Sequence, residues 1–141
     1  LRDVLVVRCA LVELAVQLAC ERIDKREIKE LHAAADHFRD VLGSDDITQI
    51  AQADEAFHDV IFTATDNGRL IQLLNNLREQ MYRYRIEHLK KKECHPQLLA
   101  EHEAIIAAIE SRDKEKATKI TGQHINNQVD TVLGTLKRKE E

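Results

Sequence analysis

Four side chains of types that bind transition metals fall on apolar helical faces of this sequence. Asp54 and His58 are four residues apart, so they lie one turn apart on the same face of a helix. That face also carries apolar residues and is expected to point into a core, as are the faces that carry His102 and His124. A buried carboxylate and buried imidazoles are costly without partners. They either pair with one another or bind a metal ion.

The ligand types indicate which ions would fit. One carboxylate and three imidazoles suit zinc first, and nickel, cobalt, manganese or iron(II) are also compatible. A lone core histidine is usually structural, but three of them with a carboxylate, on three separate helices, favour a metal site. By contrast, His32 and His37 lie beside charged residues and are expected to be solvated, and His95 is expected to be exposed or to cap a helix.

Other catalytic and metal motifs fit poorly. A di-iron bundle site needs two Glu-x-x-His pairs, and only Glu55 with His58 has that spacing, with Glu55 on a different face. His102-Glu103 begins a His-Glu-x-x-His motif, which Ile106 breaks. The sequence has neither a Gly-rich phosphate loop nor a Gly-x-Ser-x-Gly elbow.

Helices must position these residues, because the sequence has one Pro and four Gly and repeats its apolar residues at helical spacing. The pattern predicts helices over residues 2–22, from Asp24 to Gly43, from Ser44 to about Asp66, from Leu70 to Leu89, from Pro96 to Ile109, and from Ser111 onward. We therefore expect an all-α antiparallel bundle of six or seven helices, forming a single domain over residues 1–141.

Composition narrows the class of protein. The 141 residues carry a net charge of -4, which argues against a broad basic surface for nucleic acid. No apolar run approaches the roughly 18 residues of a membrane span, so we expect no membrane partner. Cys9, Cys20 and Cys94 are widely spaced and are typical of free thiols in a reducing compartment, which predicts a cytoplasmic protein.

Three runs of the sequence resemble a known family. They are VVRCALVELAVQLA, DEAFHDVIFTATDNGRLIQLLNNL and EHEAIIAAIESRDKEKATKITGQHI. Together they resemble the FCD domain, the C-terminal effector-binding domain of FadR-type regulators in the GntR family. In the metal-binding branch of that family, the ligands fall on the positions that are Asp54, His58, His102 and His124 here. One departure, Ser111-Arg112-Asp113 where Gly-Asp is common, is expected to matter little.

The resemblance implies a sensor. Such proteins join a winged helix-turn-helix, which binds operator DNA, to a C-terminal bundle that dimerises and binds a small carboxylate or sugar acid beside the metal. The chain begins at Leu1 within a helical pattern, so we expect the N-terminal DNA-binding domain to be absent from it. This chain is then expected to form a homodimer, with Val6 and Ile86 on candidate surfaces, and to contact DNA only through the missing domain.

Four residues are candidates for contacting the acid. Arg8 lies on the inner side of the first helix, where it either snorkels to the surface or pairs with a carboxylate. Arg85 and Tyr82 are weaker candidates for the same role. Asn127, just beyond His124, is placed to hydrogen-bond a hydroxyl or the second carboxylate oxygen.

The alternative to a sensor is a metal-dependent hydrolase that uses a metal-bound water. Such an enzyme needs a base within reach of that water. The sequence places no further carboxylate facing inward at helical spacing from the four ligands. We therefore expect a protein without enzymatic activity.

Overall fold

The computed structural model describes the backbone of residues 2–140, and the side chains of these residues except 132, 133 and 135–140. Its elements are α1 (Arg2–Arg22), α2 (Lys25–Val41), α3 (Ile47–Ala64), α4 (Gly68–Leu89), the 3-10 turn η1 (Lys92–Cys94), α5 (His95–Glu110) and α6 (Lys114–Glu140). No strand occurs between residues 2 and 140. The predicted all-α bundle is therefore confirmed.

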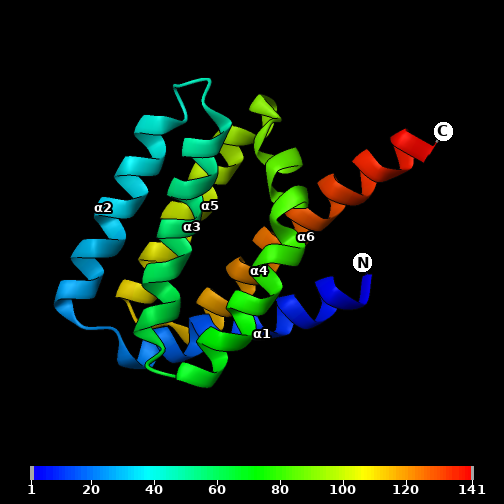
Figure 1. Cartoon of the computed structure of the whole chain (residues 1–141). Helices are drawn as coiled ribbons and strands as arrows, with labels where there is room; N and C mark the ends of the chain where they lie inside the picture. Colours follow the sequence, from blue (N-terminus) through cyan, green and yellow to red (C-terminus); the bar gives the residue numbers. More distant parts are fainter. Residues whose placement is uncertain (1, 141) are drawn as a thin grey trace.

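Helices that are far apart in the sequence pack against one another. Helix α2 packs against α3 and α5, while α1 packs against α6 and also contacts α3, α4 and α5. Figure 1 shows α1 crossing one end of the bundle and the C-terminal part of α6 extending past the other helices.

Side-chain caps explain where the helices begin. Asp24 and Glu27 form the predicted capping box, in which the Glu27 amide donates to Asp24 at 2.8 Å and the Asp24 amide donates to Glu27 at 3.2 Å. Asp46 caps α3, and Asn67 caps α4 so that this helix starts at Gly68. The apolar pattern alone placed that start two residues later, because it does not register a cap.

The apolar core consists of three clusters. The first joins α1, α2, α3, α5 and α6 and includes Phe57 and Ile105. The second joins α2, α3, α4 and α5 around Phe38. The third joins α1, α4 and α6 around Leu74. The polar side chains described in the next section lie among these clusters.

No described helix combines the length and the apolar character needed to cross a bilayer, in agreement with the sequence. The three cysteines are free thiols, as their spacing predicts. Cys20 is buried, and burial raises the pKa of its thiol.

The turn between α5 and α6 holds an arginine in the left-handed conformation. Arg112 has a φ of 58°, a region that glycine adopts more readily than any other residue. Its guanidinium donates to the carbonyl oxygens of Cys20 at 2.8 Å and Ile23 at 2.7 Å, at the C-terminal end of α1. Because carbonyls at a helix end lack partners within the helix, Arg112 ties α1 to this turn.

We predict that Arg112→Ala lowers the free energy of unfolding by about 2 kcal/mol, since two charge-assisted hydrogen bonds are lost while the left-handed backbone stays strained. Arg112→Gly should lose about 1 kcal/mol less, because glycine adopts this φ at little cost. Urea unfolding measures both. Arg26→Ala, which removes only an exposed ion pair with Glu30, is the control and should change stability little. Equal losses for Ala and Gly would contradict the backbone part of the argument.

Candidate metal centre

The four predicted ligands converge in the interior of the bundle. Asp54 and His58 extend from α3, His102 from α5 and His124 from α6, and their exposed fractions are 1%, 8%, 1% and 2%. One ring nitrogen from each histidine lies within 4.8 Å of the others. Asp54 Oδ1 is 3.5 Å from His58 Nε2 and 3.4 Å from His102 Nε2. The helical spacing therefore brings together all four side chains that the sequence singles out.

Three of these side chains have buried polar atoms without hydrogen bonds. Both carboxylate oxygens of Asp54, His58 Nε2 and both ring nitrogens of His102 have no hydrogen-bond partner in the described part of the chain. Buried polar atoms in proteins are nearly always hydrogen-bonded, so such a group requires an explanation. Ligand atoms about 2.1 Å from a tetrahedral zinc ion lie about 3.4 Å apart, which matches the Asp54–histidine distances. The three histidines therefore fit a single metal ion, with Asp54 beside His58 and His102.

Aromatic rings fix the position of His102. Its imidazole stacks on Phe57, with ring centroids 4.2 Å apart and an interplanar angle of 14°. Phe38 packs against the imidazole of His102 at 4.8 Å. Since Phe57 precedes His58 and belongs to the first apolar cluster, the apolar core positions the imidazole of His102 as well.

The charge states suit metal binding. Burial raises the pKa of Asp54, but the neighbouring His58, His102 and Arg85 favour its charged form and hold the pKa well below its usual value. Burial lowers the pKa of His58 to about 4, although Asp54 opposes this shift. At neutral pH, Asp54 is an anion and His58 is neutral, which are the forms that coordinate a metal.

A carboxylate that the sequence analysis missed lies behind His124. Glu101 Oε2 is 3.3 Å from His124 Nδ1, within ion-pair distance although not aligned as a hydrogen bond. Asn127 Nδ2 donates to the same oxygen at 3.2 Å. Burial raises the pKa of Glu101, but His124 and Asn127 outweigh it and lower the pKa below its usual value. A carboxylate on Nδ1 orients an imidazole so that its Nε2 faces the metal.

The sequence analysis found no further carboxylate facing inward at helical spacing from the four ligands, and the half-buried Glu101 approaches His124 from outside that spacing. Glu101 directly precedes His102, and its side chain is 17% exposed. On a helix, adjacent residues point about 100° apart, so Glu101 reaches His124 on α6 from the edge of the face that carries His102. Its position three residues after the buried Leu98 was the available signal.

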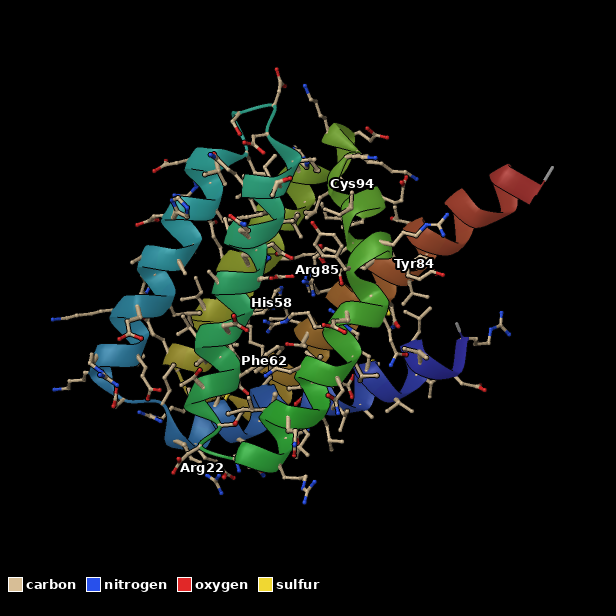
Figure 2. The ribbon with its side chains drawn as sticks, in the orientation of Figure 1. Arg22, His58, Phe62, Tyr84, Arg85 and Cys94 are labelled. Atoms are coloured by element: carbon tan, nitrogen blue, oxygen red, sulfur yellow. The ribbon has the colours of Figure 1, made fainter. Side chains whose placement is uncertain are left out.

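The two candidate arginines lie beside the cluster. Arg85 Nε is 3.6 Å from Asp54 Oδ2, and its Nη1 donates to Glu55 Oε1 at 2.9 Å. Figure 2 shows Arg85 and His58 together in the interior between α3 and α4. Arg8 borders a cavity of about 10 Å³ that His58 and His124 also line. Arg8 is half-buried and thus borders the interior beside two of the candidate ligands.

The other two candidates for contacting an acid are placed less favourably. Tyr82 is 44% exposed, and the structure does not bring it to the cluster. The amide of Asn127 is engaged by Glu101. As predicted, His32 and His37 are exposed, while His95 lies 2.7 Å from the carbonyl oxygen of Leu89, where it caps the end of α4.

Three residues that the sequence analysis did not single out line a second cavity, of about 20 Å³, which adjoins the cluster. They are Tyr84, His88 and Gln128, and Arg8 and Arg85 line the same cavity. Gln128 Nε2 is 3.4 Å from His124 Nε2, so the cavity begins directly beside a predicted ligand. His88 extends the stripe of Leu77, Met81 and Tyr84 by one turn, and this spacing was the signal that could have found it.

Comparison with known proteins agrees with the resemblance. Residues 3–127 match the FCD domain. This chain therefore belongs to the FCD domain family. A curated protein of Bacillus subtilis (strain 168), named uncharacterized HTH-type transcriptional regulator YdhC, is 23% identical over 137 residues, which are 96% of this chain. The chain spans 61% of the length of that relative.

Two solved structures share the fold. E. coli McbR/YncC superposes with a TM-score of 0.86 at 17% identity, covering 95% of this chain and 68% of that chain. A transcriptional regulator of the GntR family from Pseudomonas syringae pv. tomato str. DC3000 superposes with a TM-score of 0.76 at 21% identity, covering 98% and 57%. At these identities, the likeness concerns the fold alone.

We predict that the purified protein carries about one divalent transition ion per chain, measured by inductively coupled plasma mass spectrometry. His102→Ala and His124→Ala should each lower the metal content, because each removes one of four ligands. His32→Ala and His37→Ala are matched controls and should keep it, since both side chains are exposed. A chelator should lower the melting temperature by leaving buried polar atoms unsatisfied. Equal metal content in all four variants would rule out the site.

Proposed function

We propose that this chain is the effector-binding domain of a GntR-type transcriptional regulator. The match to the FCD domain over residues 3–127 supports this proposal, and the similar proteins are named as HTH-type or GntR-family regulators. Those proteins are longer than this chain. In the whole protein, a winged helix-turn-helix domain N-terminal to this sequence would bind operator DNA in the cytoplasm.

The proposal of a metal-dependent receptor is supported by the buried ligand set, three members of which have atoms without hydrogen bonds. Asp54, His58, His102 and His124 would hold a divalent transition ion, zinc before nickel, cobalt, manganese or iron. The absence of hydrogen bonds to Asp54, His58 Nε2 and His102 in the described structure supports this role, because it leaves these atoms available to an ion. A divalent ion bound there would act as a Lewis acid, which a carboxylate oxygen of the effector can coordinate.

A small carboxylate or sugar acid is the effector that best suits the charge of this site. An ion of charge +2 and the single anionic ligand Asp54 leave about one positive charge. Burial and the charge of Arg85 lower the pKa of Arg8 to about 10, so Arg8 is a cation at neutral pH. An anion that enters an apolar interior needs such compensation.

Homodimerisation completes the proposal. Closed two-fold dimers are the commonest oligomers of soluble proteins. Val6 on α1 is 65% exposed and its neighbour Val7 is 51% exposed, which leaves apolar surface on this helix. Ile86 packs partly against the second apolar cluster, so it offers less surface than Val6. Effector binding would shift the population of dimer states and thereby the placement of the DNA-binding domains.

A metal-dependent hydrolase is the weaker alternative. The candidate for its base is Glu101, a carboxylate that lies beside His124. Glu101 lies on the outer nitrogen of His124 and accepts a hydrogen bond from Asn127. These contacts favour a role in orienting His124 over proton transfer from a water at the centre.

Calorimetry with acids of two to six carbons should find one that binds the metal-loaded protein. Chelation should weaken the best acid about tenfold or more, since one of its charge-assisted contacts is lost. Arg8→Ala should weaken it by a similar factor. Arg83→Ala, which removes an exposed cation from α4, should not. If the acid binds the chelated protein as tightly as the metal-loaded protein, the metal is structural and the receptor proposal is wrong.

Sedimentation equilibrium at micromolar concentration should give twice the 16.2 kDa mass of one chain. Val6→Asp should shift the equilibrium toward the monomer, because it places a charge on the apolar surface of α1. Leu73→Asp on α4, at a position that is 41% exposed, tests whether the fourth helix contributes. A mass equal to one chain for the unmodified protein would contradict the dimer.

A further inference from the structure

The cavity that adjoins the candidate metal cluster is lined by five polar side chains and by the apolar Leu5, Met81 and Val129. Arg8 extends into it from α1, Tyr84, Arg85 and His88 from α4, and Gln128 from α6. Arg8 also borders the smaller cavity beside His58 and His124, so it faces both spaces. A short molecule with one end at the metal ligands would therefore bring its other end to these walls.

His88 marks this cavity as a binding site. Its side chain is buried, with 6% exposed, and its Nδ1 has no hydrogen-bond partner among the described residues. Burial lowers the pKa of His88, so the ring is neutral at neutral pH and can place a proton on Nδ1. A buried donor without a partner is unfavourable unless a ligand satisfies it.

Arg8 differs from Arg85 in its pairing. Arg85 already contacts two carboxylates, those of Glu55 and Asp54. Arg8 forms no hydrogen bond or ion pair with any described side chain. Burial is the main cause of its lowered pKa. The cavity is thus lined by one half-buried cation, Arg8, whose charge is not offset by direct contact with a described side chain. A guanidinium in this position favours a carboxylate, which it can bind through two parallel hydrogen bonds.

Building on the proposed function, we infer that the effector is a short diacid, with one acid group at the metal ligands and the second in the cavity between Arg8 and His88. Arg8 pairs with the second carboxylate, and His88 Nδ1 donates a hydrogen bond to it. The cavity of about 20 Å³ admits only a few atoms unless the helices separate. It therefore selects a compact group such as a carboxylate and excludes a long acyl chain.

Succinate and butyrate provide the test, because they share four carbons and differ by one acid group. Calorimetry on the metal-loaded protein should show that succinate binds about tenfold or more tightly than butyrate, with malonate and glutarate establishing the best length. Arg8→Met should remove the preference for the diacid, while Arg8→Lys retains part of it. Arg83→Met makes the same charge change on the exposed side of α4 and should leave the preference unchanged.

Variants of His88 separate its hydrogen bond from its volume. His88→Phe fills the space without a donor and should weaken the diacid several-fold, with butyrate little affected. His88→Asn places an amide nitrogen near the position of Nδ1 and should restore most of the diacid affinity. If both variants bind succinate as the unmodified protein does, the role of His88 is overturned.

The remaining outcomes distinguish this inference from the proposed function. Butyrate binding as tightly as the best diacid overturns the second acid group but leaves the metal receptor intact. A diacid preference that survives chelation overturns the metal receptor but leaves the Arg8 site intact. If no acid of the series binds, both are wrong.

Discussion

The interior of this bundle is built around a carboxylate and three imidazoles that have too few partners. Asp54, His58 and His102 are buried and lack hydrogen bonds at the atoms that face one another. Each unsatisfied buried group costs about 1–3 kcal/mol, a large share of the roughly 5–15 kcal/mol that stabilises a typical domain. Three apolar clusters around these residues supply the compensating burial. A fold that tolerates this cost without a ligand gains much when an ion satisfies the same atoms.

The sequence predicted the architecture and the burial of the four candidate ligands, because both follow from helical periodicity. Apolar spacing placed Asp54 and His58 on one inward face and did the same for His102 and His124, and the structure buries all four. The capping box at Asp24 was also visible, since its two residues are local in sequence. Each of these features depends on contacts within one helix or on the face that a helix must bury.

Contacts between helices could not be predicted in the same way. Glu101 lies next to an inward residue and was assigned to the outer face, yet it reaches His124 across the gap between α5 and α6. Tyr82 was preferred over Tyr84, although the cavity is lined by Tyr84. A difference of two residues rotates a side chain by about 200° around a helix, and the apolar stripe of Leu77 and Met81 places Tyr84 inward, a signal that the choice of Tyr82 overlooked.

The side chains around the candidate site come from two different sets of helices. The candidate metal ligands come from α3, α5 and α6, whereas the guanidinium groups of Arg8 and Arg85 come from α1 and α4. A ligand that contacts both sets draws α1 and α4 toward the other three helices. Because α1 carries the exposed Val6 and Val7, a shift of this helix would reach the surface proposed for dimerisation. A ligand held by the metal alone would not displace α1, since it would contact only the helices that carry the candidate metal ligands.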